Sequence, residues 1–428
     1  MKIQAVKIDG FKNLSDIVIH FNNITALVSL NNFGKSNVLM AIDFGLSFIK
    51  SSLDDKTKMM SNLNLIPLNQ TMVGRNFRFE MEITFHANDH DYRMIYGYEF
   101  SWKYNEKVEP CIIKEFLKIK YDEKGQKYNK FISRNKNEAF YKSSETGRCS
   151  TKINVQDNEL VINKLCAYDH LYYLDIILRL NNMRFYMENN FDAKSFYQPN
   201  PFIQKDLEDI MINAINLPRV IYQLKETYPD KFLLLKDVYS QLFPEVEDLI
   251  VNQYELTGIE KENIPENAPF VLAHSIYVLF VKNKYIHQPI NFQAMSDGAK
   301  RVFMILTKVI LSSVSNISLI AIEEPENSVH PSLFQSYIRI ISQLLNGCKI
   351  IITSHSPYII NYLDPSWLHI GINRTPGVAE FFMFKKSGER LLQKDAEAFK
   401  MNMGDYLFLL LSDPDNNLDD YLEYERNE

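Results

Sequence analysis

The spacing of hydrophobic positions changes several times along the chain, and each change predicts a different structure. Between Lys2 and Phe21, apolar and polar residues alternate, which is typical of two strands joined by the turn "DGFKNLSD". The apolar stretch "ITALVSL" that follows predicts a buried strand. After a short loop, the apolar positions recur at helical spacing, at Val38, Leu39, Ile42, Leu46 and Ile49. The sequence therefore predicts a strand, a loop and a helix in direct succession.

Further strands are predicted in the N-terminal part of the chain, residues 1–162. Strand-like patterns occur in "FRFEMEITF", "YGYEFSWKY" and "IIKEFLKIKYDEKGQKYNKFISR". We expect these segments to form a mostly antiparallel continuation of the first hairpin.

Residues 163–288 show apolar spacings of three and four, which predict a helical insertion. The pattern is clearest in "LCAYDHLYYLDIILRLNNMRFYM", "DLEDIMINAINLPRVIYQLKE" and "FLLLKDVYSQLF". No heptad pattern continues for many turns, which excludes a long coiled-coil arm as a main feature. Residues 289–400 return to alternating strands and helices, and residues 401–428 form an acidic tail.

Composition narrows the class of protein only a little. The 428 residues, 46% of them hydrophobic, suffice for one large core or two ordinary ones. The formal net charge of −6 is small for this length, so any contact with nucleic acid must be local. The four cysteines are far apart with no C-x-x-C pair, which argues against structural zinc and predicts reduced thiols in the cytoplasm. No apolar run approaches the roughly 18 residues of a membrane span, so we expect no membrane contact.

The loop between the predicted strand and helix carries the first candidate chemistry. Its sequence, "SLNNFGKSN", occupies residues 29–37 and contains the Gly-Lys-Ser of phosphate-binding loops. In such loops the backbone N–H groups surround phosphate oxygens and the lysine neutralises them. Ser29 stands where these loops usually begin with glycine.

Two acids and a histidine follow predicted strands in the C-terminal part. The strand in "ISLIAIEEPENSVHP" ends at Glu323 and Glu324, and ligands of open α/β sheets gather at the carboxyl ends of strands. Of two adjacent acids, one can hold Mg²⁺ while the next orients the attacking water. His355 follows the strand "KIIIT", 31 residues after Glu324, the length of one strand-helix-strand crossover. We therefore expect the histidine beside the acids; the alternative is a solvated acidic turn and a structural histidine.

A third feature opens a predicted helix upstream of the acids. In "AMSDGAKRVFMILTKVILSS", Ser296 and Gly298 lie at the start of an apolar helical stripe. A serine hydroxyl and free backbone N–H groups at a helix start can bind an anion. Taken alone, the feature is an ordinary N-cap.

Four motifs thus occur in the order "SLNNFGKS", "MSDGAKR", "IAIEEPE" and "TSHSP". Together with the start "IDGFKNLSDIVIHF", they resemble the ABC-type ATPase heads of the RecF, SMC and OLD group. That group includes the AAA-like ATPases of bacterial anti-phage and abortive-infection systems. The resemblance covers roughly residues 1–100 and 290–372. It implies an α/β fold, an ABC-type ATPase head in which a mixed sheet with a P-loop core is joined to antiparallel strands and carries a helical insertion.

The resemblance also implies ATP and Mg²⁺ as cofactors and a role for each motif. Lys35 would reach the β- and γ-phosphates, Glu324 would act as general base and His355 as switch histidine. Ser36 and Glu323 would hold the metal ion. The residues expected to contact nucleotide are Asn31, Asn32, Phe33, Gly34, Lys35, Ser36, Asn37, Ser296 and Gly298.

In such families the signature serine and glycine contact the γ-phosphate bound to another subunit. The resemblance therefore implies a homo-oligomer, at least a head-to-head dimer. Three departures from the family pattern, at Ser29, Asp297 and Glu323, predict slow turnover that is typical of a switch. An added carboxylate at Asp297 repels phosphate unless a neighbouring cation screens it.

Three functions stay open at the sequence level. The first is a regulatory or sensor subunit of an anti-phage complex that controls a separate effector, a nuclease or a toxin. Only 73 residues follow His355, too few for the nuclease domain of OLD proteins, and the acidic tail could dock a basic partner. The second is a RecF- or SMC-like DNA clamp, supported by residues 103–152 with 13 Lys/Arg, 7 Asp/Glu and interleaved aromatic residues. The third is a nucleotide-dependent scaffold with negligible hydrolysis.

Overall fold

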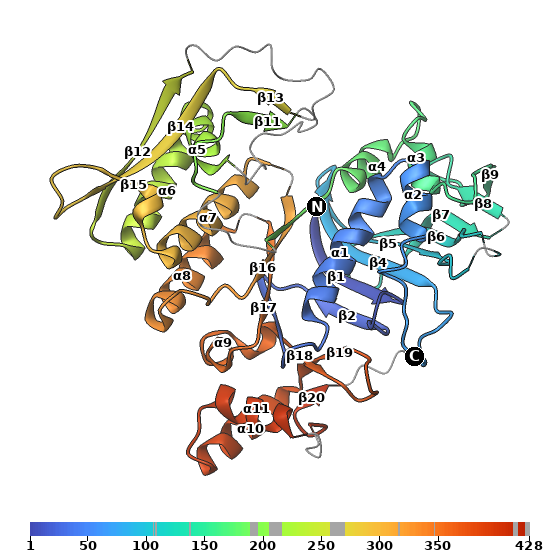
Figure 1. The fold of residues 1–428 in the computed structure, drawn as a ribbon. Coiled ribbons are helices and arrows are strands. Elements are labelled where there is room, and N and C mark those ends of the chain that lie inside the picture. The colour runs from blue at the N-terminus through green and yellow to red at the C-terminus, as the bar shows by residue number, and fades with distance from the viewer. Residues whose placement is uncertain are drawn as a thin grey trace. The chain divides into compact units, whose positions relative to one another are not determined.

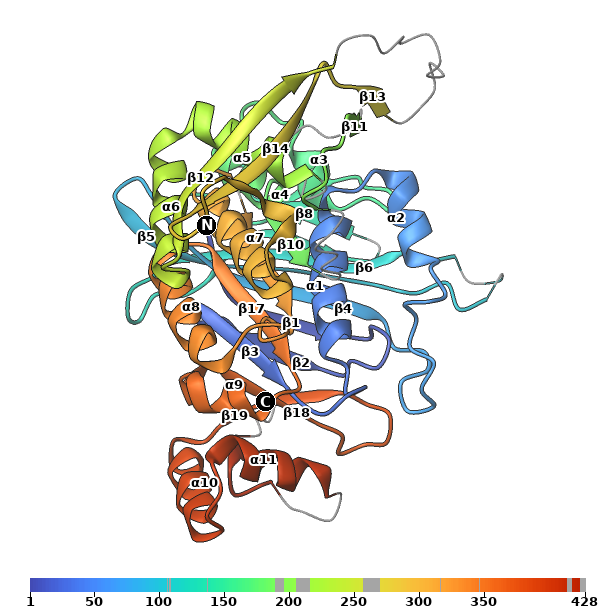
Figure 2. The ribbon, with the colours of Figure 1, turned by 60° about the vertical axis from the view of Figure 1, so that its left-hand side comes forward.

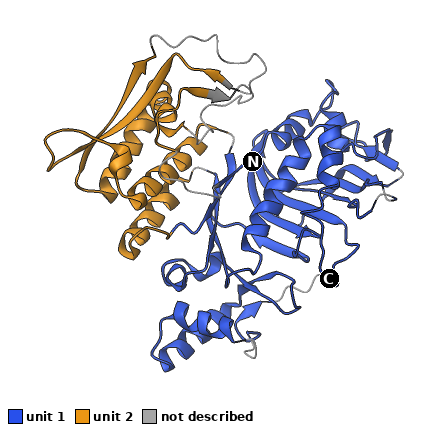
Figure 3. Cartoon of the chain, viewed as in Figure 1, with its two compact units in different colours: residues 1–188, 316–325, 347–428 blue, residues 189–315, 326–346 orange. Residues whose placement is uncertain are grey.

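The computed structural model describes the chain apart from residues 106, 108, 137, 189–195, 205–215, 257–269, 316, 346, 414–417 and 424–428. The chain divides into two compact units (Figure 3). The first comprises residues 1–188, 316–325 and 347–428, and the second comprises residues 189–315 and 326–346. Each unit is built around its own sheets and helices.

The first unit contains an antiparallel sheet of eight strands within the described residues (Figure 1). Every neighbouring pair runs antiparallel, as the sequence pattern predicts. Along β4, buried and part-exposed residues alternate, because one face of the sheet covers the core. In spatial order, the strands are β2 (Ile17–His20), β1 (Lys2–Asp9), β4 (Phe77–Ala87), β5 (His90–Phe100), β6 (Ile112–Tyr121), β7 (Asn129–Asn135), β8 (Glu138–Tyr141) and β9 (Thr151–Ile153).

The same unit contains a mixed sheet of seven strands in the described part of the chain (Figure 2). Five neighbouring strands, β10, β16, β17, β3 and β18, run parallel to one another. The next two, β19 and β20, each run antiparallel to the strand before them. In spatial order, the strands are β10 (Arg184–Glu188), β16 (Ile317–Glu323), β17 (Lys349–Ser354), β3 (Ile24–Val28), β18 (Leu368–Ile372), β19 (Glu380–Phe384) and β20 (Leu422–Glu423).

One hydrophobic core joins these two sheets. Helix α1 (Lys35–Lys50) contributes buried residues such as Val38 and Ile42, and both sheets contribute others, such as Phe79 and Ile351. Because Leu27 of β3 and Val38 of α1 both belong to this core, the loop between them connects two packed elements. The other helices of the unit are α2 (Leu53–Met60), α3 (Val161–Leu165), α4 (Leu174–Asn181), α9 (Pro357–Tyr362), η4 (Pro365–Trp367), α10 (Lys386–Ala398) and α11 (Met403–Ser412).

The described part of the second unit contains helices and small antiparallel sheets. Helices α6, α7 and α8 contact one another, and the antiparallel pair of strands β12 and β14 packs on α5 and α6. The helices are α5 (Leu217–Thr227), α6 (Pro229–Leu242), η3 (Phe292–Ala294), α7 (Asp297–Ser312) and α8 (Pro331–Leu344). The strands are β11 (Phe202–Gln204), β12 (Val246–Glu255), β13 (Phe270–Leu272), β14 (Ser275–Asn283) and β15 (Ile290–Asn291).

The predicted insertion, residues 163–288, is therefore mixed in structure. Helices α5 and α6 lie where helical spacing predicts them, whereas most of the helix predicted from "DLEDIMINAINL" falls outside the described residues. The segment "RFYM", for which apolar spacing predicts a helix, lies in strand β10, which pairs in parallel with β16. Its pairing partner lies more than a hundred residues away, and local spacing does not reveal such a partner.

The boundaries of the two compact units differ from those predicted from the sequence, which fall after residues 162, 288 and 400. Because β10 pairs with β16, the chain up to residue 188 belongs with the first unit. Because α7 and α8 pack on α6, both helices belong with the second. In the acidic tail, Leu418, Tyr421 and Leu422 are buried, and β20 adds to the mixed sheet. None of the helices in the described part of the chain is long and apolar enough to cross a bilayer.

Candidate active site

The phosphate loop connects β3 to α1, as predicted. Two of its residues have positive φ angles, Asn32 at 64° and Gly34 at 90°. Gly34 is the N-cap of α1, and no side chain caps the helix start. The backbone N–H groups of this first turn therefore have no side-chain acceptor and suit an anion. A Cβ atom at Gly34 would lie 2.6 Å from the Cβ atom of Ala379, so glycine is required by space as well as by φ.

Lys35 folds back onto the start of its own loop. Its Nζ donates to the carbonyl oxygens of Ser29 at 2.8 Å and Leu30 at 2.9 Å, and to the Ser29 hydroxyl at 3.2 Å. The ammonium group is thus held within the loop, from where its flexible chain can turn toward a bound phosphate.

Ser29 is fully buried at the point where β3 meets the loop. Its N–H donates to the carbonyl oxygen of Ser354 at 3.4 Å, which links the loop to the residue before His355. Its Cβ atom lies 2.8 Å from where a Cβ atom of Gly371 would be. Ser29, which replaces the usual glycine, is therefore closely packed at the carboxyl end of β3.

Asn13, in the turn between β1 and β2, holds the loop from the other side. Its Oδ1 accepts a hydrogen bond from Nδ2 of Asn37 at 2.7 Å, and its carbonyl oxygen accepts one from the N–H of Ala379 at 2.8 Å. The sequence pattern predicts no role for Asn13. The only local signal is its place in the turn "FKNL", and the contact with Asn37 depends on tertiary structure.

The strand register brings the predicted acids and histidine to the same edge. Glu323 pairs with Thr353, and Ser354 pairs with Val28, so β16, β17 and β3 end level with one another. The parallel order of these strands explains this arrangement, since their carboxyl ends share one edge of the sheet.

Glu324 and His355 are in direct contact. Oε1 of Glu324 lies 2.8 Å from Nδ1 of His355, and the two side chains are 35% and 42% exposed. The N–H of Glu324 donates to the carbonyl oxygen of Thr353 at 2.8 Å. Glu324 has a φ of 49°, which is uncommon for a residue with a side chain and is found preferentially at functional sites. A carboxylate next to an imidazole at a sheet edge can accept a proton from water.

The signature residues lie in the second unit, at the start of α7. Ser296 is the N-cap, and its hydroxyl accepts a hydrogen bond from the N–H of Ala299 at 3.3 Å. Asp297 pairs with Lys300, whose Nζ lies 2.9 Å from the carboxylate. Gly298 is buried, and a Cβ atom there would lie 2.1 Å from the carbonyl oxygen of Ser328. In this structure the glycine allows close packing of α7 against the turn after β16.

ATP and Mg²⁺ fit the residues of the first unit. The uncapped start of α1 and the lysine suit phosphates, and Ser36 and Glu323 would hold the metal together with phosphate oxygens. Bound Mg²⁺ would neutralise phosphate charge. Among the described residues, no group of three or more His, Cys, Asp or Glu side chains could hold a metal ion. The expected Mg²⁺ ligands do not require such a group, because they are one serine, one glutamate and phosphate oxygens.

One protein family matches most of the chain. The model of the AAA ATPase domain family matches residues 1–360. No curated protein matches the sequence. Among solved structures, the chain is similar to an SMC head bound to the C-winged helix domain of ScpA, with a TM-score of 0.44, 15% identity and coverage of 89% of this chain and 97% of that chain.

Two further SMC heads give comparable values. The head domain from Thermotoga maritima has a TM-score of 0.41 and 12% identity, with coverage of 90% and 100%. The head domain with an extended coiled coil bound to the C-terminal domain of ScpA, derived from Pyrococcus furiosus, has a TM-score of 0.43 and 12% identity, with coverage of 92% and 99%. Since the family match spans most of the sequence, this chain belongs to the AAA ATPase domain family.

Proposed function

We propose that the chain hydrolyses ATP at this site and uses its nucleotide state as a switch. The observation that carries the proposal is the 2.8 Å contact between Glu324 and His355, one strand away from the loop that bears Lys35. Glu324 accepts a proton from the attacking water, and His355 orients the carboxylate and senses the terminal phosphate. Lys35 leaves the oxygens of Ser29 and Leu30 and donates to phosphate oxygens instead.

Two features favour slow turnover over fast turnover. The Ser29 hydroxyl also accepts a hydrogen bond from Nζ of Lys35, so the lysine must break this bond as well before it can bind phosphate. At the signature, the Asp297 carboxylate is screened by Lys300, which lowers its repulsion of a phosphate without removing the negative charge. Such a site suits a switch that changes its nucleotide state slowly.

The switch serves, in this proposal, as the regulatory subunit of an anti-phage defence complex that controls a separate effector. The resemblance of the four ordered motifs to ATPases of such systems supports this role. Exposed apolar side chains on α9, on α11 and after α10 also support it, since they fit a protein partner; they are Tyr358, Leu409 and Phe399.

Steady-state release of phosphate tests the catalytic assignment. Both Lys35→Ala and Glu324→Gln should lower the rate by at least about 100-fold, since one removes the phosphate ligand and the other the base. Glu324→Gln should still bind ATP. The matched control is Glu397→Gln, an exposed glutamate of α10, which should keep the full rate. Unchanged turnover in Glu324→Gln would contradict the assignment.

A DNA clamp is the second candidate, and one specific surface favours it. A hollow of about 350 Å³ on the antiparallel sheet is lined by lysines of β6 and β7 around an aromatic ring. The ammonium groups of Lys114 and Lys118 lie 5.6 and 5.0 Å from the ring of Phe116, and Lys130 lines the same hollow. Lysines around an aromatic ring suit phosphates and bases.

Two measurements separate the candidates. Strong stimulation of ATP turnover by duplex DNA, lost in Lys114→Glu/Lys118→Glu, would favour the clamp. Co-purification of a nuclease or toxin with the tagged protein from its native host, without DNA stimulation, would favour the regulatory subunit.

A further inference from the structure

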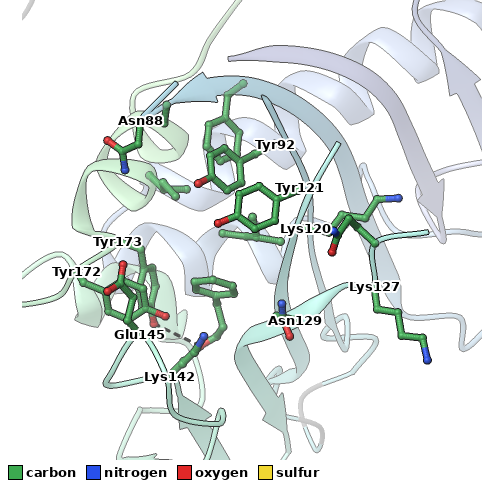
Figure 4. Close-up of a pocket in the computed structure, with 16 residues that line it drawn as sticks. Asn88, Tyr92, Lys120, Tyr121, Lys127, Asn129, Lys142, Glu145, Tyr172 and Tyr173 are labelled. Atoms are coloured by element: carbon green, nitrogen blue, oxygen red, sulfur yellow. Dashed lines mark hydrogen bonds between the residues drawn. The ribbon is translucent and has the colours of Figure 1, made fainter. Parts of the chain in front are cut away.

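A cavity of about 360 Å³ in the first unit has no part in the site described above. Its lining comes from the ends of β4 to β7, the loops between them, the segment after β8 and the start of α4, so every lining residue falls within residues 85–176 (Figure 4). We call it the tyrosine pocket, after the four tyrosines that line it, Tyr92, Tyr121, Tyr172 and Tyr173. None of the residues of the phosphate loop lies within that range.

Two pairs of aromatic rings face the tyrosine pocket. The rings of Tyr92 and Tyr121 lie 5.0 Å apart with an angle of 30° between their planes, and those of Tyr172 and Tyr173 lie 4.9 Å apart and nearly perpendicular. Figure 4 shows the first pair on β5 and β6 and the second pair across the opening before α4. Tyr121 is 42% exposed and Tyr172 is 40% exposed, so both rings keep surface free for stacking.

Polar groups lie around these rings. The amides of Asn88 and Asn129 line the pocket and can both donate and accept hydrogen bonds. The ammonium group of Lys142 lies 5.0 Å from the ring centre of Phe131 and 5.8 Å from that of Tyr172.

The charge of the lining is positive on balance. Lys120, Lys127 and Lys142 line the cavity together with the single acid Glu145. In Figure 4 the amines of Lys120 and Lys127 point away from the tyrosines, toward the outside of the pocket. The rings therefore suit a planar group inside, while the lysines suit an anion at the mouth.

We propose that the tyrosine pocket is a second nucleotide site, which holds a nucleobase between the tyrosines while the attached phosphate contacts the lysines. Stacking on tyrosine accepts any base, and the two amides can bond a base edge. The volume lies within the roughly 300–1,000 Å³ of small-ligand sites. The ligand is either a free mononucleotide or the end of a single-stranded nucleic acid, since both present a base and a phosphate.

Binding to full-length protein carrying Lys35→Ala tests the proposal, because this background weakens binding at the phosphate loop. The probes are AMP and a 5′-phosphorylated tetrathymidylate, each followed by isothermal titration. We expect one site per chain for at least one probe. Tyr121→Ala should weaken binding about tenfold, as loss of a stacking ring does elsewhere, whereas Tyr121→Phe should retain it. Lys142→Met should weaken binding and reduce its dependence on salt.

Matched controls come from outside the pocket. Tyr254→Ala removes a tyrosine of similar exposure, 45%, from β12, and Lys152→Met removes an exposed lysine of β9. Neither should change binding. ATP turnover by Tyr121→Ala in the chain that retains Lys35 should also stay unchanged, so failure here and failure of the proposed ATPase site are distinguishable.

The two sources of ligand give different results. Tighter binding of AMP identifies a free nucleotide as the ligand, and tighter binding of the oligonucleotide identifies a strand end. The proposal is overturned if neither probe binds at millimolar concentration, or if Tyr121→Ala and Tyr254→Ala bind equally well.

Discussion

At the scale of single residues, Ser29 shows how a departure from a motif can acquire a role. A glycine at this position would offer Lys35 a carbonyl oxygen but no hydroxyl, whereas the Ser29 hydroxyl lies 3.2 Å from the ammonium group. The lysine must leave these oxygens to reach a phosphate.

We therefore expect Ser29→Ala to bind ATP more tightly, by about 2- to 10-fold, the equivalent of about 0.5–1.5 kcal/mol for one hydrogen bond. Titration of Glu324→Gln protein, with and without Ser29→Ala, measures this change without hydrolysis. Weaker ATP binding after Ser29→Ala would show instead that the hydroxyl positions the lysine for its phosphate.

A second residue-scale prediction concerns His369 in β18. The ring is buried, and Nε2 accepts a hydrogen bond from the N–H of His20 at 3.1 Å. Burial, and to a lesser degree the neighbouring His20, lowers the pKa of His369 from 6.5 to about 3. In the unfolded chain this histidine binds a proton below about pH 6.5, whereas in the folded chain it stays neutral down to about pH 3. The free energy of unfolding therefore falls as the pH falls from about 6.5 to about 3.

At pH 5, His369 lowers the free energy of unfolding by about 2 kcal/mol relative to neutral pH. His369→Gln keeps an acceptor for the N–H of His20 but does not titrate. Denaturant unfolding at pH 7 and pH 5 should show a smaller difference in free energy for His369→Gln than for the unsubstituted chain. Equal differences would contradict the prediction.

At the scale of elements, the start of α7 depends on its glycine. The carbonyl oxygen of Ser328 lies close to Gly298: a Cβ atom on residue 298 would be only 2.1 Å from it. Because Ser328 contributes backbone at this contact, Gly298→Ala must push the turn away from the helix. We expect a loss of about 1–3 kcal/mol in the free energy of unfolding, typical of overpacking.

Ser296→Ala provides the comparison, since it removes only the N-cap of the same helix, at a cost of about 1 kcal/mol. Hydrogen exchange at the amides of α7 would localise both effects. A Gly298→Ala protein as stable as the parent would mean that the turn can move freely.

The elements also show how far sequence patterns reach. Strand β3, helix α1 and the strands β16 and β17 lie where apolar spacing predicts them, because each has one dominant period and clear ends. Strand β10 does not, since the apolar spacing of "RFYME" fits a helix as well, and its strand state comes from pairing with β16. Asn13 likewise gains its role only through contact with Asn37.

At the scale of the whole molecule, the proposed switch implies ATP-dependent association. The signature residues lie in a different compact unit from the phosphate loop, and in the resembling families they contact ATP of another subunit. We expect Glu324→Gln to dimerise when ATP is added, and Ser296→Arg in that background to stay monomeric, because a bulky cation would block the helix start.

Sedimentation velocity with ATP, ADP and no nucleotide measures this equilibrium. Ser313→Arg, at the other end of α7, is the matched control and should leave dimerisation intact. A Glu324→Gln protein that stays monomeric at saturating ATP would rule out the head-to-head arrangement.

The sequence by itself determined the order of strand, loop and helix around Lys35, the position of Glu323 and Glu324 at a strand end, and a crossover length that places His355 near them. These features are local, and the spacing and chemistry of consecutive residues specify them. Only the tertiary structure decided the 2.8 Å contact of Glu324 with His355, the burial of Ser29, the support by Asn13 and the tyrosine pocket. These depend on which strands pair and in which register, and that is settled by packing between segments far apart in the chain.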